Sequence, residues 1–363
     1  MKLAICGGGT AGHILPAISI AKALKLLISP IEIVAIGSNR DIDRQLYEQE
    51  GLKFISGGGV AVLGSRWLAP YRLIANAVGI LKALRYMRHY KPDVVLSTGA
   101  YASVPGSLAA LLLDIPLVLY TSDALPGRAA KLQALFAKQI AVTSQVARSA
   151  FGDKEAIVTG PPLRPEFNHQ EPERAFARFG LSTELPILVI LGGSQGSSTI
   201  NKAICPILGQ LLKSMSVVHI TGTKEKLQFE ALRKTLGTKK ASRYYPIGFV
   251  SQGLADLLSA ASLAVSRAGG SIYELTATAT PSILIPGEFA DGHQKWNARI
   301  ITEAGAGVMI EESNLSPKRL LMHIERLLND DKLRTSMTKA TKSISKMNAA
   351  DRIAKILIEI SRK

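Results

Sequence analysis

Two segments nearly half a chain apart share one organisation. Each begins with a short apolar run, Lys2–Cys6 or Ile187–Leu191, passes through a glycine-rich turn and enters residues with helical spacing. A strand that stops at glycines and enters a helix gathers backbone N–H groups and the positive end of the helix dipole at one point, which favours a phosphate or diphosphate. The sequence therefore predicts two Rossmann-like units, one in each half of the chain.

Further apolar runs alternate with helical spacing, which predicts an α/β fold with two parallel sheets. We expect strands at 31–36, 94–97, 116–120 and 140–143, then at 217–220, 244–247, 263–265 and 282–285, and a helical segment over 201–215. The proline-rich segment 159–165 predicts a hinge. The expected domains are residues 1–163 and 164–345, and a helix at about 346–363 is expected to pack back on the first domain.

The second expected strand ends at Gly37-Ser38-Asn39. A dinucleotide-binding unit would carry Gly-x-Gly-x-x-Gly in its first turn and an acidic residue here for the ribose, and this chain has neither. The pattern argues against an NAD enzyme.

The chain is strongly basic, with 44 Lys and Arg against 28 Asp and Glu and a formal net charge of +16. This excess implies an anionic partner: a phosphorylated substrate, an acidic lipid surface or nucleic acid. Nucleic acid ranks last, because the basic residues are not interleaved with aromatic ones in a known binding motif.

Two observations bear on the compartment. No window reaches the ~18 consecutive apolar residues of a membrane span, and the N-terminus lacks the pattern of a signal peptide, so a cytoplasmic location is expected. The two cysteines, Cys6 and Cys205, stand in apolar surroundings and are expected to be buried structural thiols.

The stretch 66–91 offers more apolar side chains than one core-facing helix needs, together with several Arg and Lys residues. Such a helix suits an acidic bilayer surface. A core helix with a solvated basic side explains the pattern equally well.

Three groups of residues could carry chemistry. Glu274 follows the turn Ser266–Gly270 and could accept ribose hydroxyls, although a first-turn glutamate more often compensates the helix dipole. The polar run 291–298 suits sugar recognition, or is a polar surface loop with a capped helix. His13 ends the first glycine turn and could take a proton near neutrality, although a lone histidine is usually structural.

Six motifs in order resemble the MurG family of glycosyltransferases. They are Gly-Gly-Gly-Thr-Ala-Gly-His at 7–13, Thr-Gly-Ala-Tyr-Ala-Ser-Val-Pro-Gly at 98–106, Gly-Pro-Pro-Leu-Arg at 160–164, Gly-Gly-Ser-Gln-Gly at 192–196, Ser-Arg-Ala-Gly at 266–269 and His-Gln-Lys-Trp-Asn-Ala at 293–298. The resemblance implies a GT-B fold, with two Rossmann-like domains facing a cleft. It also implies inverting, metal-independent transfer of N-acetylglucosamine from UDP to the 4-hydroxyl of undecaprenyl-diphosphate-linked muramyl pentapeptide, without a cofactor, at the cytoplasmic face of the membrane.

The resemblance also assigns residues. His13 is the implied base, and the first domain is the one that meets an anionic membrane surface, which favours the membrane interpretation of 66–91 and of Trp67, Leu68, Tyr71 and Arg72. Near the donor diphosphate or sugar the resemblance implies Thr10, Ala11 and Gly12, and at the diphosphate itself Arg164 and Ser194. It implies Val250 at the uracil, Glu274 at the ribose and Gln294 at the sugar. Ser271 and Asp123 complete the implied substrate-binding residues.

One motif departs from the family. Tyr120-Thr121-Ser122-Asp123 stands where the family has His-Glu-Gln-Asn, and a carboxylate cannot donate the hydrogen bonds of an amide. A transferase with another sugar or lipid acceptor therefore stays open, as does a non-catalytic relative. A UDP-N-acetylglucosamine epimerase is less favoured, because no run in the second half supplies the several carboxylates it would need.

Overall fold

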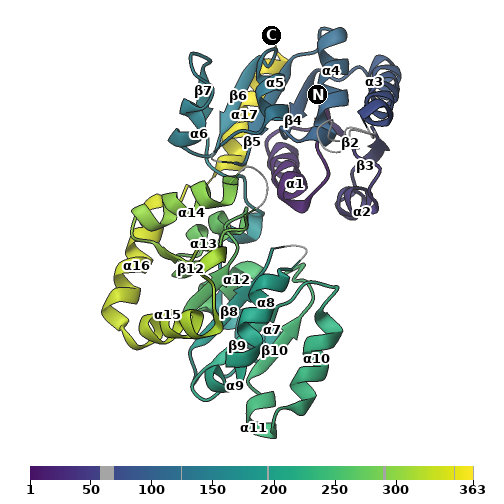
Figure 1. Ribbon diagram of the computed structural model, residues 1–363. Coiled ribbons are helices and arrows are strands. Elements are labelled where there is room, and N and C mark those ends of the chain that lie inside the picture. The colour runs from purple at the N-terminus through teal and green to yellow at the C-terminus, as the bar shows by residue number, and fades with distance from the viewer. Residues whose placement is uncertain (58–68, 124, 194–195, 289–291, 347, 363) are drawn as a thin grey trace. The chain divides into compact units, whose positions relative to one another are not determined.

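The computed structural model describes residues 1–57, 69–123, 125–193, 196–288, 292–346 and 348–362. Contacts divide the chain into two units, Met1–Arg164 with Lys346–Lys363, and Pro165–Ser345 (Figure 1). The division therefore falls one residue after the boundary expected from the sequence. Among the described residues, no helix is long and apolar enough to cross a membrane.

The first unit is built on a seven-stranded sheet in the order β3-β2-β1-β4-β5-β6-β7, and its strands pair in parallel. Its central strands read as nearly unbroken apolar runs because helices cover both faces. The strands are β1 (Lys2–Cys6), β2 (Glu32–Gly37), β3 (Lys53–Ser56), β4 (Val94–Ser97), β5 (Leu117–Thr121), β6 (Gln139–Val142) and β7 (Ala156–Val158).

Side chains of β1 alternate between the two faces of the sheet, and each face has its own hydrophobic core. Leu3 and Ile5 join a cluster with α1 and α17, whereas Ala4 and Cys6 join another with α3 and α4. Helix α17 thus belongs to the first unit and lies against α1 (Figure 1). The helices are α1 (Ala11–Leu27), α2 (Asp41–Gln49), α3 (Ala69–Tyr90), η2 (Tyr101–Ser103), α4 (Val104–Leu112), α5 (Arg128–Ala134), α6 (Gln145–Ser149) and α17 (Ala349–Ser361).

The second unit repeats the design with six parallel strands in the order β10-β9-β8-β11-β12-β13. The residues of β8 and β9 are all buried. The strands are β8 (Ile187–Leu191), β9 (Ser216–Ile220), β10 (Tyr244–Ile247), β11 (Leu263–Ser266), β12 (Ser282–Leu284) and β13 (Gly307–Met309).

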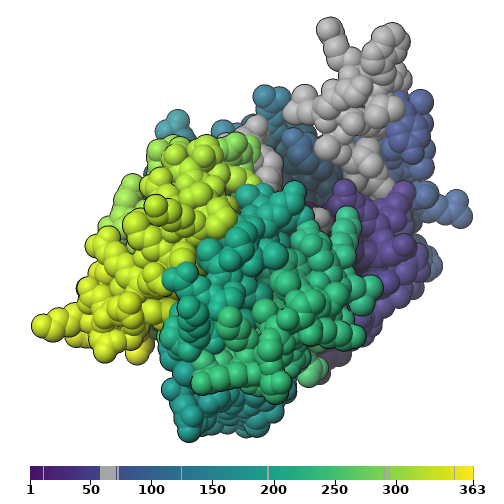
Figure 2. Space-filling view, turned by 60° about the horizontal axis from the view of Figure 1, so that its bottom comes forward, coloured from purple at the N-terminus to yellow at the C-terminus, as the bar shows by residue number. Residues whose placement is uncertain are grey.

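Helices cover this second sheet, and α15 packs on α8 and η4, so the yellow-green surface in Figure 2 borders the teal one. They are η3 (Pro165–Phe167), α7 (Pro172–Phe179), α8 (Ser198–Ile204), η4 (Cys205–Ile207), α9 (Leu208–Leu211), α10 (Lys226–Thr235), α11 (Thr238–Ala241), α12 (Leu254–Ala260), α13 (Ser271–Ala277), α14 (His293–Glu303), η6 (Glu312–Asn314), α15 (Pro317–Asn329) and α16 (Asp331–Ile344).

The segment with helical spacing at 201–215 is helical as far as Leu211, in three successive pieces. Pro206 lacks a backbone N–H and its ring crowds the preceding turn, so α8 passes into η4 before α9. One expectation about this region was wrong. Cys205, in η4, is exposed rather than buried. Cys6 is buried as expected, and burial raises the pKa of its thiol to about 12.

Candidate active site

The glycine turns lie at the points where the strand order reverses. In the first sheet the reversal falls between β1 and β4, and in the second between β8 and β11. Open parallel sheets bind ligands outside the carboxyl ends of the strands at such points. The turns after β1 and β4 are therefore a candidate ligand-binding edge of the first sheet, and the turns after β8 and β11 are the corresponding edge of the second sheet.

His13 lies in the first turn of α1 and reaches across to the end of β4. Its Nδ1 is 3.2 Å from the backbone oxygen of Thr98. A carbonyl oxygen can only accept, so Nδ1 carries the proton in this hydrogen bond. In the neutral ring, Nε2 then holds a free lone pair and can accept a proton.

The other predicted residues of this edge stand at strand or helix ends. Helix α1 begins at Ala11, so the backbone N–H groups of Ala11 and Gly12 have no acceptor within the helix. Thr10 is exposed, and its side chain makes no capping hydrogen bond. Asp123 is half-buried just after β5, the strand next to β4.

The sequence predicted that the backbone N–H groups of the glycine turn after β1 gather to bind a phosphate. One of them is already bonded within the protein, which corrects this expectation. The backbone N–H of Gly9 donates to the carboxylate of Asp43, at 2.9 and 3.0 Å from its two oxygens. Asp43 comes from α2, 34 residues further along the chain, and sequence reasoning missed it because nothing local to the turn points to it.

The turn after β8 is shaped by contacts within the fold. A Cβ on Gly196 would lie 2.2 Å from the backbone oxygen of Thr221, and its φ of +78° is in the left-handed region, so only glycine fits. Ser197 follows it and caps α8, because its hydroxyl accepts from the N–H of Ile200 at 3.3 Å. Ser194 lies outside the described residues.

A buried polar network holds the helix that follows this turn. The amide nitrogen of Asn201 donates to Thr221 O at 3.0 Å and to Glu225 at 2.8 Å, so its oxygen is left to accept from His219 Nε2 at 2.9 Å. His219 Nδ1 therefore accepts from the hydroxyl of Tyr244 at 2.9 Å. Burial lowers the pKa of His219 to about 3, in agreement with a neutral ring.

The turn after β11 carries Ser271 and Glu274 in the first turn of α13. The Ser271 hydroxyl lies 2.9 Å from Ser266 Oγ and 3.2 Å from the backbone oxygen of Arg267, so its nearest partners belong to the turn itself. Glu274 is half-buried.

Two side chains of α14 face this turn. The Gln294 carbonyl oxygen accepts from the N–H of Gly287 at 2.9 Å, while its amide nitrogen lies 3.8 Å from the position of a Cβ on Gly269. The amide nitrogen of buried Asn297 donates to Ala268 O at 3.0 Å. Asn297 therefore fixes α14 on the turn, and Gln294 presents its N–H₂ group beside Gly269.

An ion pair between Arg267 and Glu312 links the turn after β11 to η6. Arg267 is 8% exposed, and its guanidinium donates to Glu312 at 2.8 Å and to Ile285 O at 3.2 Å. Glu312 also accepts from the N–H of Glu288 at 3.2 Å. The hydrogen bond from Arg267 is the main reason why the pKa of Glu312 is lowered to about 2. Sequence reasoning did not single out Glu312, which lies 45 residues after Arg267.

The remaining predicted residues are distributed as follows. Val250 is buried and follows β10, and half-buried Arg164 closes the first stretch of the first unit. Tyr71 in α3 is 70% exposed, and Arg72 belongs to the same helix. Trp67 and Leu68 lie outside the described residues.

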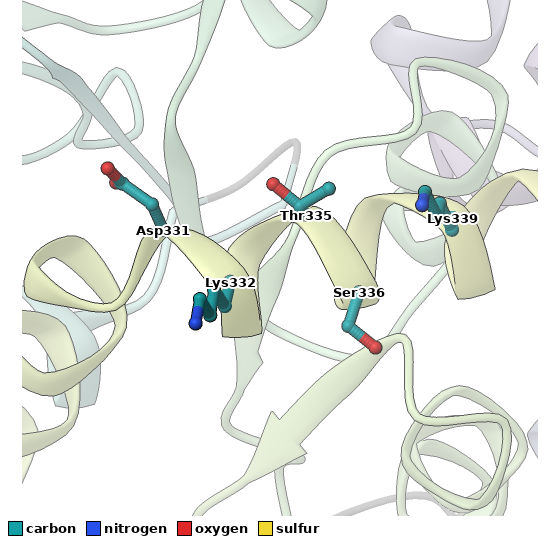
Figure 3. A pocket seen from close by; sticks show the side chains of 5 residues that line it. All are labelled: Asp331, Lys332, Thr335, Ser336 and Lys339. Carbon is teal, nitrogen blue, oxygen red and sulfur yellow. The ribbon is translucent and has the colours of Figure 1, made fainter.

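Two other features stand apart from these edges. A depression of about 360 Å³ is lined by side chains of α16 alone, among them Lys332, Thr335 and Lys339 (Figure 3). It takes no residue from a strand end and does not join the candidate site. Within the described ranges, no group of three or more His, Cys, Asp or Glu residues is placed to hold a metal ion.

Comparison with known proteins identifies the family. Residues 3–142 match the glycosyltransferase family 28 N-terminal domain, and residues 187–355 match the family 28 C-terminal domain. The chain is 34% identical over 370 residues to the UDP-N-acetylglucosamine--N-acetylmuramyl-(pentapeptide) pyrophosphoryl-undecaprenol N-acetylglucosamine transferase of Acetivibrio thermocellus, covering 100% of this chain and 99% of that one. The chain belongs to the MurG family. The transferase of the same name from Bacillus subtilis is 29% identical over the full length of both chains.

Solved structures agree on the fold of this MurG-family glycosyltransferase. The crystal structure of Acinetobacter baumannii MurG matches with a TM-score of 0.74 at 22% identity, covering 99% of both chains. The S. aureus MnaA–UDP co-structure matches with a TM-score of 0.72 at 14% identity, covering 100% of this chain and 98% of that one. At such identities the likeness shows the fold alone, and that fold is the two-domain GT-B fold predicted from the sequence.

Proposed function

We propose that this chain transfers N-acetylglucosamine from UDP-N-acetylglucosamine to the 4-hydroxyl of undecaprenyl-diphosphate-linked muramyl pentapeptide, the step that forms lipid II in peptidoglycan synthesis. The observation that carries the proposal is 34% identity, over essentially the whole of both chains, to a transferase with that name. In the reaction, the acceptor oxygen forms a bond to the anomeric carbon as the bond from that carbon to the diphosphate oxygen breaks. UDP leaves, and the anomeric configuration is inverted.

His13 is the proposed base. The hydrogen bond from its Nδ1 to Thr98 O supports this role, because it orients the ring and leaves Nε2 as the proton acceptor. The acceptor 4-hydroxyl would give its proton to Nε2 as its oxygen attacks.

The second unit is the proposed site for the uridine of the donor and for part of its sugar. Glu274 would accept hydrogen bonds from the ribose hydroxyls, and the amide nitrogen of Gln294, held beside Gly269, would donate to the sugar. Val250 would meet the uracil through its backbone, and Ser271 would support the site from within the β11 turn. Arg164, Ser194 and the N–H groups at Thr10–Gly12 are the groups proposed for the diphosphate and the adjoining sugar, where they would stabilise the charge of the leaving group.

Asp123 bears on which UDP-sugar or acceptor the chain prefers. It stands where the family pattern has an amide, and a carboxylate only accepts hydrogen bonds. We propose that Asp123 lies close enough to the reacting sugars for this difference to change the preference among UDP-sugars or acceptors.

The proposed membrane surface is the outer side of α3. Tyr71, Leu73, Ile74, Val78 and Leu81 are 44–70% exposed, and Lys82, Arg85 and Arg88 on the same helix are also exposed. Apolar side chains flanked by basic ones suit the headgroup region of an anionic bilayer. The chain would act as a peripheral protein at the cytoplasmic face of the membrane, where its lipid-linked acceptor is.

The test is a radiolabel transfer assay with UDP-N-acetylglucosamine and other UDP-sugars on an undecaprenyl-linked muramyl acceptor. The expected result is label from UDP-N-acetylglucosamine in the lipid product. Asp123→Asn in the same assay is expected to change the ranking of the UDP-sugars. Conversion of the donor to its 2-epimer without label in the lipid would replace the proposal with an epimerase, an activity found among proteins of this fold.

A further inference from the structure

We infer that Asp43 is a positioning residue for the proposed transfer reaction. Its carboxylate accepts a hydrogen bond from the first glycine turn, in the way a bound anion would. We infer that this contact fixes the path of the chain from Gly9 to the proposed base His13. The inference rests on the proposed function only for its kinetic consequence, because the contacts themselves are a feature of the fold.

Asp43 is fully buried and gathers donors from two strand ends. Besides both contacts with the N–H of Gly9, its Oδ2 accepts from the N–H of Ser38 at 2.9 Å and from the Ser38 hydroxyl at 2.7 Å. Ser38 follows β2 directly and Gly9 belongs to the turn after β1, so one carboxylate ties together the ends of two neighbouring strands.

The peptide of Gly9 is held from both sides. While its N–H donates to Asp43, its carbonyl oxygen accepts from Arg40 Nη1 at 2.7 Å. Arg40 and Asp43 both belong to the start of α2, where the positive end of the helix dipole favours a carboxylate. The Gly9 N–H belongs to the peptide that joins it to Gly8 and the Gly9 C=O to the peptide that joins it to Thr10, so both peptide planes beside Gly9 are held against rotation. The next four residues lead to His13.

Glycine at position 8 leaves room for the Asp43 carboxylate. A Cβ on Gly8 would lie 2.0 Å from Asp43 Oδ2 and 3.0 Å from the nitrogen of Ser38. The carboxylate of Asp43 is therefore sufficient to require glycine at position 8. The glycine turn, which the sequence suggested as a phosphate cradle, holds an anion of its own at Gly9.

This arrangement divides the N–H groups of the turn into two sets. The group at Gly9 faces Asp43, whereas those at Ala11 and Gly12 begin α1 and have no acceptor within the helix. The N–H of Gly9 is closed to a substrate oxyanion, whereas the groups of the second set lie two residues or fewer from His13. Asp43 thus directs anion binding toward the reacting end of the turn.

The experiment compares Asp43→Asn with the parent chain. An amide of the same size keeps one acceptor oxygen but turns a donor toward Gly9 or Ser38, so the turn should shift. We expect kcat to fall by roughly 10- to 100-fold, as a displacement of about 1 Å at a reacting group does. We expect the KM for UDP-N-acetylglucosamine to change less than about threefold, because Val250, Glu274 and Gln294, proposed for the uracil, ribose and sugar, lie in the second unit. Hydrogen exchange should accelerate in a peptide covering 7–13 and stay unchanged in one covering β5.

Asp41→Asn is the matched control, since Asp41 is exposed in the same first turn of α2. It should keep the parent kcat and exchange rates. Parent-like kcat and exchange in Asp43→Asn would overturn the inference. Faster exchange throughout β5 would do so too, because it would show general loosening of the unit. If the parent chain transfers no sugar, the proposed function fails, and the exchange measurement alone still decides whether Asp43 holds the turn.

Discussion

At the scale of single residues, one hydrogen bond determines what the ring of His13 can do. The contact from Nδ1 to Thr98 O fixes which nitrogen donates and leaves Nε2 as the nitrogen that can accept a proton, as the proposed role requires. His13→Asn keeps a donor near the position of Nδ1 but removes the proposed base. We expect kcat to fall by about 10²- to 10⁴-fold, the usual contribution of general base catalysis, with unchanged UDP affinity by calorimetry. His169→Asn changes an exposed histidine of the second unit and should leave kcat alone. Near-parent turnover in His13→Asn would remove it as the base.

The pair of Arg267 and Glu312 gives the second unit a pH-dependent contribution to its stability. The pKa of Glu312 is lowered from its ordinary value near 4.5 to about 2, mainly by the hydrogen bond from Arg267. The folded unit therefore favours the carboxylate, and this stabilisation is complete above about pH 4.5 and is lost as the pH falls toward 2.

Glu312→Gln should lower the free energy of unfolding of the second unit by about 1.5–3 kcal/mol at pH 7, because it weakens a charged hydrogen bond to a buried guanidinium. The difference from the parent should shrink as the pH falls below about 4.5 in urea titrations. Glu311→Gln is the control, since its ion pair with Lys295 is exposed and should contribute little. A difference that stays constant with pH would contradict the assignment.

At the scale of elements, α3 has one side buried in the first unit and another side exposed. Gly79, Ala83 and Met87 are buried on it, whereas Ile74 and Leu81 are 64% and 65% exposed. Replacing both exposed residues with serine should reduce binding to anionic vesicles about tenfold for each, given about 1.5–3 kcal/mol for burying such a side chain fully. Vesicle co-sedimentation measures this. Leu227→Ser on α10, at a site 76% exposed in the second unit, should bind like the parent. Equal loss in both variants would mean that α3 is not the docking surface.

At the scale of the whole molecule, the last helix in the sequence completes the first unit. Ile353, Ala354 and Leu357 of α17 are fully buried in the cluster that also contains Leu3 and Leu24. The stability of the first unit thus depends on residues that follow the second unit in the chain.

Leu357→Ala should destabilise the first unit by about 2–5 kcal/mol, as other large-to-small core changes do. UDP should still bind with parent affinity and raise the unfolding temperature of the second unit. Scanning calorimetry with and without UDP separates the two effects. Leu26→Ala, at a site 86% exposed in the first unit, is the control and should change little. Loss of UDP affinity in Leu357→Ala at temperatures where its first unit is still folded would contradict this prediction.

The sequence by itself determined the two parallel sheets and most of their strands, because a strand buried on both faces needs an unbroken apolar run that can be recognised locally. It did not predict β3, β7 or β13, which are only 3–4 residues long and include half-buried or exposed residues. It also predicted the glycine turns, whose residues are contiguous. Only the tertiary structure decided that the N–H of Gly9 is taken by Asp43 from 34 residues away, and that the Arg267 side chain beside the second unit's turn is held by Glu312 from 45 residues away. Hydrogen bonds depend on distance in space, and no local spacing encodes that distance.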